Sequence, residues 1–334
     1  MNFTKPAMTD STRRALLAAL AASCITVPFA AVAQDRYPSR PITLVIPFPA
    51  GGQTDQVGRV IAEQLTRRLG QPVVVENRPG VNGSLASELV AHKAPDGYTL
   101  VATGPGTHAI NQLVNPNVKY DARKDFTHVA MLARTSNVLL ASPSYKANSL
   151  ADVIAQSKAQ PKSVNFALTG IGASGHMSME LLKQAAGVDF NAVPYKGDAP
   201  AITDLIGGQV NLLFVNATAA VPFVQGGKLR ALAVTGTSRN PLLPNVPTMA
   251  EAGVPGVVVE SFVGLAGPAG LPAPIVERLN QECQAILAMP EIRQRLATMG
   301  IATMPGSAQD ATRFIAAEVD KWSRVVKAGN IRVE

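Results

Sequence analysis

Residues 42–69 read ITLVIPFPAGGQTDQVGRVIAEQLTRRL, and this stretch decides the fold class. The apolar, partly β-branched run Ile42–Ile46 predicts a buried strand, and a loop with Gly51 and Gly52 ends it. The segment after the loop carries apolar residues at the period of an amphipathic helix and stops at Gly70. Strand, glycine loop and helix form the first unit of an open α/β sheet, in which ligands bind where strands end and helices begin. The stretch therefore indicates either an anion site or no more than a tight glycine turn.

The second half of the chain repeats this order of elements. A buried strand, a glycine loop and a helix return at Val164–Leu168, Gly170–Gly175 and Ser174–Ala186. Alternating strands and helices predict parallel sheets flanked by helices. We therefore expect an α/β fold of two modules whose loops face each other across a cleft. Three further helices are expected to pack back on the first module, over residues 274–289, 290–299 and 307–327.

The two predicted domains are interleaved along the chain. The first ligand-binding domain comprises residues 34–135 plus 260–334, and the second comprises residues 136–259. Two short strands, residues 128–133 and 138–142, are expected on either side of the first crossing. The chain then crosses back before the C-terminal helices, and two crossings predict a hinge that closes on a ligand.

Residues 1–33 predict a cleavable signal peptide. Three basic residues precede an apolar run, and small residues predict cleavage near Ala33. The route of export, general secretory or twin-arginine, stays open. The mature chain keeps Cys283 as its one cysteine, so no intramolecular disulfide can form. We expect a periplasmic protein.

The charge of the chain mildly favours anionic ligands. The formal net charge is +7, and the predicted signal peptide holds three basic residues and one acidic residue, which leaves about +5 for the mature chain. No basic run accompanies aromatic residues, so nucleic acid is not an expected partner. No later stretch is long and apolar enough to span a bilayer.

Two motifs suggest chemistry and are weighed against simpler interpretations. The glycine loop has the G-x-G-x-x-G spacing of a dinucleotide site, but Asp189 stands at the beginning of the next strand rather than at its end. Ser174 precedes His176, yet the nucleophile elbow needs glycine two places after the serine. The four histidines lack the spacing of metal ligands. We therefore expect no catalytic residue, no cofactor and no metal.

Several other polar residues admit a structural role. Thr54 or Asp55 can cap the first helix, and Asp55 and Arg59 stand four residues apart as a local ion pair does. Lys196 and Asp198 follow a predicted strand, so Lys196 can meet an anion or simply face solvent.

With these motifs in view, the chain resembles the periplasmic solute-binding receptors of tripartite tricarboxylate transporters, often called Bug receptors. The resemblance runs over essentially the whole mature chain. Its segments are YPSRPITLVIPFPAGGQTDQVGR, LGQPVVVENRPG, APDGYTLV, GIGASGHMSMELL, VPYKGDAPAITDLIGGQV, GKLRALAVT, NVPTMAEAGVPG and GPAGLPAPIVERLN.

The resemblance implies a two-domain, type II periplasmic binding protein fold with a double-crossover hinge. It implies that the loops Phe48–Thr54, Gly104–His108 and Gly170–Ser174 contact a small ligand, commonly a carboxylate. It also implies delivery to integral membrane transporter subunits. The chain departs from the family where Asn211 and Val215 replace a frequent Asp, and where Phe262 replaces a frequent Trp.

We predict a monomeric receptor for a small organic anion, with no chemistry of its own. One alternative is a secreted α/β hydrolase that uses Ser174, and another is a receptor whose output is signalling. The ligand class is left open among aliphatic carboxylates, acidic amino acids, aromatic carboxylates and uncharged amides. The predicted ligand-binding residues are Phe48, Ala50, Gly52, Thr54, Thr107, Gly172, Ser174 and Asn216.

Overall fold

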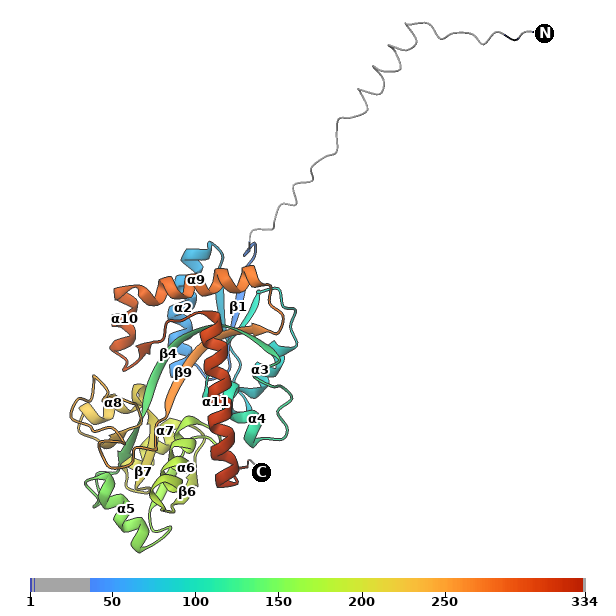
Figure 1. Cartoon of the computed structure of the whole chain (residues 1–334). Coiled ribbons are helices and arrows are strands. Elements are labelled where there is room, and N and C mark those ends of the chain that lie inside the picture. The colour runs from blue at the N-terminus through green and yellow to red at the C-terminus, as the bar shows by residue number, and fades with distance from the viewer. Residues whose placement is uncertain (2, 4–36, 333–334) are drawn as a thin grey trace. The chain divides into compact units, whose positions relative to one another are not determined.

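The computed structural model describes Met1, Phe3 and residues 37–332 (Figure 1). Contacts divide the chain into two units, residues 1–37 and 38–334, and the second unit holds every helix and strand described below. The predicted cleavage site at Ala33 and most of the predicted signal peptide lie outside the described residues. Within the described residues, no helix is long and apolar enough to cross a membrane.

The first half of the unit is built on three parallel strands. β1 pairs with β2 on one side and with β3 on the other. The predicted helix stop is confirmed, because Gly70 ends α2 with φ of 71°, a conformation that glycine adopts without strain. The elements are β1 (Ile42–Ile46), α2 (Gln53–Leu69), β2 (Val73–Asn77), the 3₁₀ turn η1 (Val81–Gly83), α3 (Ser84–Ala91), β3 (Thr99–Thr103), the π-helical turn η2 (Gly106–Ile110) and α4 (Asn111–Val114).

The second half repeats the parallel arrangement, because β5 pairs in parallel with both β6 and β7. Helix α8 is an element that the sequence did not predict, since Pro222 stands inside it. The elements are α5 (Leu150–Ala159), β5 (Asn165–Leu168), α6 (Ser174–Ala186), β6 (Asn191–Pro194), α7 (Asp198–Ile206), β7 (Leu212–Asn216), α8 (Ala217–Gln225) and β8 (Arg230–Val234).

Two long strands join the halves and add antiparallel pairing to the predicted parallel-type sheets. β4 (Phe126–Ala141) is one continuous strand where two short ones were expected, and β9 (Glu260–Pro268) pairs with it and with β3. The polar run Arg134–Asn137 suggested a break, but its backbone stays paired with β9 and β7. The strand order is therefore β2-β1-β3-β9-β4-β7-β5-β6, and β4 belongs to both halves of the sheet.

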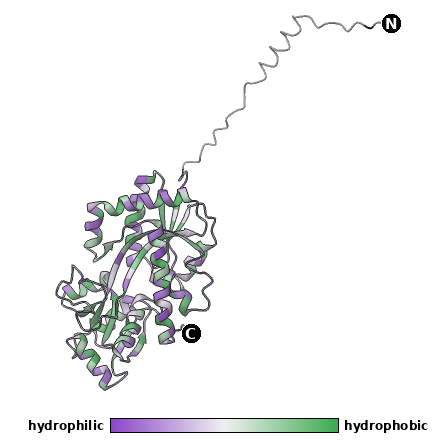
Figure 2. Cartoon of the chain, in the orientation of Figure 1, coloured by the Kyte–Doolittle hydropathy of each residue, from purple (hydrophilic) through white to green (hydrophobic). Residues whose placement is uncertain are grey.

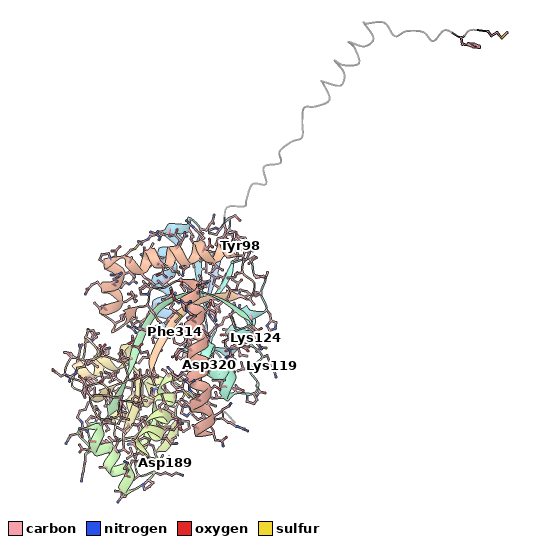
Figure 3. All side chains as sticks on the ribbon, in the orientation of Figure 1. Tyr98, Lys119, Lys124, Asp189, Phe314 and Asp320 are labelled. Atoms are coloured by element: carbon pink, nitrogen blue, oxygen red, sulfur yellow. The ribbon has the colours of Figure 1, made fainter. Side chains whose placement is uncertain are left out.

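The C-terminal helices pack as predicted. α9 lies against α2, and α11 crosses β4 and η2 (Figure 1). The apolar face of α11 includes the fully buried Trp322, and Phe314 (labelled in Figure 3) meets Phe262 edge-on at 5.1 Å. These elements are α9 (Ala273–Ala288), α10 (Pro290–Ala297), β10 (Ala302–Thr303) and α11 (Ala308–Gly329).

The core follows the strands. Side chains on the two faces of β4, β5 and β7 form separate apolar clusters, with Phe166 and Phe214 in one and Ala167 and Leu213 in the other. Along the helices, hydrophilic and hydrophobic residues alternate, as Figure 2 shows for α9 and α10. These helices therefore turn their apolar side to the protein interior and leave their polar side to solvent.

Candidate functional site

A cavity of about 360 Å³ opens where the strands of both halves end. It is bounded by the loops and helix starts that follow β1, β2, β3, β5 and β6, by the C-terminal end of β7, and by one residue of β9. The strand-end position is the one expected for a ligand in an open α/β sheet. The lining residues are Phe48, Pro49, Ala50, Gly52, Gln53, Thr54, Asn82, Gly104, Pro105, Gly106, Thr169, Ala173, Ser174, Gly175, Gly197, Asp198, Phe214, Val215, Asn216 and Ser261.

Helix starts converge on this cavity. Among the described residues, four α-helices place their N-cap residue in its wall: α2, α6, α7 and α8, with η2 beginning there as well. None of these four α-helices has its first turn capped by a described side chain. The first N–H groups of a helix lack partners within the helix and carry partial positive charge. The wall therefore offers donors to an anion without a basic side chain.

A polar cluster behind the cavity holds the loop at the start of α2. The Asp55 carboxylate accepts hydrogen bonds from Gly51 N at 2.9 Å, from Asn77 Nδ2 at 2.8 Å and from Arg59 Nε at 3.0 Å. Asn77 Nδ2 also donates to the carbonyl of Phe48 at 3.1 Å. Burial raises the pKa of Asp55, but the hydrogen bonds from Arg59, Gly51 and Asn77 outweigh it, and the pKa lies below its ordinary value. The ion pair with Arg59 is confirmed, and its role is to fix the loop.

The prediction that Thr54 or Asp55 caps this helix is wrong. The N-cap is Gly52, and no hydrogen bond from a described side chain caps it. Asp55 instead accepts from Gly51, the residue before the cap. The carboxylate is thereby turned away from the first helical N–H groups, which stay available at the cavity.

The structure brings together six of the eight predicted binding residues. Phe48, Ala50, Gly52 and Thr54 come from the first half, and Ser174 and Asn216 come from the second. All six line the same cavity, and their assignment as ligand contacts stays a prediction.

Thr107 and Gly172 are not among the residues that line the cavity. The Thr107 hydroxyl is fully buried, accepts from Gly104 N at 3.0 Å and donates to the Gly104 carbonyl at 3.2 Å. Gly172 faces Asn111, Ile110 and Val114, because a Cβ placed there would lie 3.3 Å from Val114. Both residues shape the loops that line the cavity rather than forming its surface.

Ser174 and His176 do not form a nucleophile and base. Ser174 Oγ donates to Asn137 Oδ1 at 3.3 Å, whereas His176 Nδ1 accepts the N–H of Gly172 at 3.0 Å. Burial, with Lys183 nearby, lowers the pKa of His176 to about 4, so the ring is neutral at pH 7. The histidine therefore holds the Gly170–Gly175 loop in place.

His108, the other histidine next to a glycine loop, lies behind the cavity wall. Its ring packs 4.5 Å from Phe126 and 5.7 Å from His128, between ring centroids. Burial and then His128 lower the pKa of His108, which is consequently neutral. Its Nδ1 lies 2.9 Å from Thr107 Oγ1, so it supports the same loop that Thr107 holds.

Besides Gln53, which lies in the predicted loop Phe48–Thr54, four polar lining residues lie outside all the predicted residues and loops: Asn82, Thr169, Asp198 and Ser261. Asn82 donates to Asn111 Oδ1 at 2.8 Å, and Asn111 donates back to its carbonyl at 2.9 Å. A sequence signal existed for the first three, because they follow β2, β5 and β6 as the predicted loops follow their strands. Ser261 had no such signal, since it lies within β9.

Comparison with known proteins gives the family. The family model described as the tripartite tricarboxylate transporter family receptor matches residues 57–331. The chain belongs to this family. BugT of Bordetella pertussis is 37% identical over 314 residues, which cover 93% of this chain and 96% of BugT.

Two solved structures of similar proteins contain dicarboxylates. R. palustris Rpa4515, solved with adipate, is 40% identical, has a TM-score of 0.82 and matches 89% of this chain and 99% of its own. MatC from Rhodopseudomonas palustris, solved with bound malate, is 35% identical, has a TM-score of 0.79 and matches 87% of this chain and 100% of its own.

The family confirms the predicted fold class and the absence of catalysis. This tripartite tricarboxylate transporter receptor has the mixed α/β fold of periplasmic binding proteins, with strands in a curved sheet and helices on its faces. Members of the family are solute receptors of periplasmic transport, so the chain is not an enzyme and the hydrolase alternative is set aside.

Proposed function

We propose that this receptor binds a small organic carboxylate in the cavity and delivers it to the integral membrane subunits of a tripartite tricarboxylate-type transporter. The observation that carries the proposal is the convergence of four uncapped helix starts on one cavity. Helix N-termini bind anions through free N–H groups and the helix dipole. The cavity volume of about 360 Å³ lies in the range of small-molecule sites.

Direct donors complement the helix starts. Gln53 is 7% exposed, lines the cavity, and its Nε2 has no hydrogen-bond partner among the described residues. A buried amide without a partner costs free energy that a ligand carboxylate oxygen can recover. Rpa4515 with adipate and MatC with malate support a carboxylate as the class of ligand.

The proposed mechanism is closure of two lobes on the ligand. We assign residues 34–135 plus 260–334 to one lobe and residues 136–259 to the other. The cavity wall draws on both, and β4 and β9 connect them in antiparallel register. A change of twist in these two strands would bring the helix starts of the two lobes together around the ligand.

The proposed setting is the periplasm, reached through a signal peptide cleaved near Ala33. There we expect a monomer that meets its transporter subunits in the ligand-bound form. The net charge of about +5 for the mature chain favours encounter with organic anions by long-range attraction.

Thermal unfolding against a ligand panel tests the proposal. The full chain is expressed, and the exported protein is purified from the periplasm. It is unfolded and refolded to remove retained ligand, and its Tm is then measured with carboxylates and with matched amides. A ligand that binds the folded state at about 100 times its Kd stabilises by about 2.7 kcal/mol, which raises Tm by several degrees. A shift with carboxylates and not with their amides supports the function. A refolded sample that no carboxylate stabilises would refute it.

A further inference from the structure

The charge of the cavity wall is unusual for a site that takes an organic anion. Among the described residues that line it, Asp198 is the only one with a charged side chain. Lys196, two residues earlier, is exposed and does not belong to the lining. The wall therefore combines helix starts that attract a carboxylate with one carboxylate that repels it.

Asp198 is the first residue of α7 and follows Gly197, the N-cap. An acidic side chain in a first turn interacts favourably with the helix dipole, and this explains part of its presence. The same interaction offsets the positive end of α7, so this helix start attracts a ligand anion less than those of α2, α6 and α8. An anionic group seated beside Asp198 would meet a like charge instead of a donor.

The surroundings of Asp198 leave it without a basic partner among the described residues. Desolvation by the surrounding protein raises the pKa of Asp198 above its ordinary value, and the hydrogen bond with the Thr169 hydroxyl, which stabilises the charged form, only partly offsets it; the side chain still reaches solvent. On the same helix, Asp204 accepts from Tyr195 Oη at 2.8 Å. The strands packed against α7, β5 and β7, carry no titratable side chain.

A second acceptor lies in the same wall. Asn216 is the N-cap of α8, yet its Oδ1 is buried and has no hydrogen-bond partner in the described part of the chain. The second half therefore contributes the two carboxylate oxygens of Asp198 at the cavity and the unpaired Asn216 Oδ1 buried in the same wall. Gln53 Nε2 and the start of α2 supply donors from the first half.

We infer that Asp198 makes this receptor selective for carboxylates that also carry an ammonium group, the amino-acid class, over the same acids without it. This inference rests on the proposed function and narrows its ligand. The ligand carboxylate takes the donors at the helix starts, and the ammonium donates to Asp198 and to Asn216 Oδ1. An ammonium has three donors and a full charge, and it matches this acceptor set.

Matched ligand pairs test the inference. Calorimetric titration of the refolded protein compares aspartate with succinate, glutamate with glutarate, 2-aminoadipate with adipate, and phenylalanine with phenylpropionate. In the pair that binds most tightly, the aminated acid should bind at least tenfold more tightly. In Asp198→Asn this ratio should fall at least tenfold, because the amide removes the charge and keeps the shape.

The control is Asp204→Asn, which removes the same charge from the same helix outside the cavity lining and leaves an oxygen for Tyr195. Its affinity ratio should equal that of the unchanged protein. A role of Asp198 in helix stability alone would weaken both members of a pair equally and leave the ratio unchanged in Asp198→Asn. That result would overturn the inference.

The pH dependence gives an independent readout. Protonation of Asp198 removes its attraction to an ammonium, so the affinity for the aminated acid should fall in acid more steeply in the unchanged protein than in Asp198→Asn, which lacks this titration. Because the ligand carboxylates are the same in both titrations, their own protonation cancels from the comparison.

Failure of the inference can be told apart from failure of the proposed function. If unaminated acids bind as tightly as aminated ones, the protein is a carboxylate receptor without this selectivity, and only the inference fails. If no member of any pair binds to the refolded protein, the inference falls, and the full carboxylate panel then decides the function.

Discussion

Two kinds of helix start occur in this receptor. α5 and α11 begin with complete capping boxes, in which Ser149 Oγ accepts from Asp152 N and Ser307 Oγ accepts from Asp310 N, each at 3.1 Å. The helices that begin at the cavity have Gly52, Ala173, Gly197 and Asn216 as N-caps, and no described side chain caps them.

The difference separates helix starts that a side-chain cap stabilises from helix starts whose N–H groups stay available to a ligand. Asn216 shows it most clearly, because asparagine is among the best capping residues and this one makes no cap. The chain satisfies helix donors with side chains where a helix begins in solvent, and it leaves them open where a ligand can satisfy them. α3, α4, α9 and α10 are also uncapped in the described structure. α3 and α4 continue directly from the turns η1 and η2, and proline in the first turn of α9 and α10 removes one of the donors.

The largest effect is expected at Gly175, in the first turn of α6. A Cβ at this position would lie 2.4 Å from the carbonyl oxygen of Phe214, a backbone atom of β7. Gly175→Ala should displace the uncapped helix start, lower the free energy of unfolding by about 3 kcal/mol and abolish carboxylate binding. Urea unfolding and calorimetric titration measure the two effects.

Gly170→Ala is the matched control for this change. A Cβ at Gly170 would make only ordinary contact with Ala173, at 3.5 Å. It should leave both stability and affinity close to those of the unchanged protein. Normal affinity in Gly175→Ala would show that binding does not depend on where α6 begins.

The next effect is expected at Asp55, which keeps the start of α2 open by accepting from Gly51. Asp55→Asn turns an acceptor into a donor that faces Arg59 and Asn77, and it should lower the free energy of unfolding by about 2 kcal/mol at pH 7. The pKa of Asp55 in the folded protein lies below 3.8, so its contribution is present at neutral pH and is lost as the pH falls below that value.

Urea unfolding at pH 7 and pH 3 checks this sign. The difference between Asp55→Asn and the unchanged protein should be smaller at pH 3. Glu63→Gln serves as the control, because this acid of the same helix pairs with Arg67 at the exposed surface and should contribute little at either pH. An Asp55→Asn difference that grows in acid would contradict the assigned hydrogen bonds.

A third change adds a cap at the cavity. Gly52 has an extended backbone, with φ of −74° and ψ of 168°, and the nearest atom to an added Cβ lies 3.8 Å away. Gly52→Asp should therefore cap α2, raise the free energy of unfolding by a few tenths of a kcal/mol and weaken carboxylate binding at least tenfold. Gly52→Ala adds only the methyl group and should reduce affinity less. Equal affinity in all three proteins would show that the α2 start does not contact the ligand.

The smallest effect is expected when a surface cap is removed. Ser307→Ala should lower the free energy of unfolding by about 1 kcal/mol, because the Asp310 N–H loses its acceptor. Ligand affinity should stay unchanged, since α11 does not line the cavity. Urea denaturation and calorimetric titration of the same preparation measure the free energy of unfolding and the ligand affinity. A loss of affinity would show that a capped helix start away from the cavity also contributes to binding.

Local patterns predicted much of this architecture from the sequence. Apolar runs located β1 and β5, and glycines located the loops and the end of α2, because few residues other than glycine adopt the left-handed backbone conformation. The strand-loop-helix order then placed six of the eight predicted residues on one cavity.

Long-range pairing accounts for what the sequence did not predict. The run Arg134–Asn137 is polar because it lies between the two halves, where Thr135 donates to the Gly300 carbonyl and Asn137 donates to Ser178. Partners so distant along the chain leave no periodic signal, so one long strand was divided into two. Thr107 is a local case: its hydroxyl bonds to Gly104, three residues earlier, and the residue lies outside the cavity lining, so its role as a ligand donor stays a prediction.

The continuity of β4 also bears on how this protein tolerates being cut. Its ladder with β9 extends from Phe126 paired with Pro268 to Ser136 paired with Glu260, with two register shifts along the way. Cleavage of the backbone within this ladder would not separate the two lobes. Each fragment would keep part of a strand whose pairing partners lie in the other fragment. Such exposed edges recruit the nearest matching strand, which in a concentrated solution is the same segment of another molecule. The same two strands that we propose as the hinge would therefore also make the lobes inseparable as fragments.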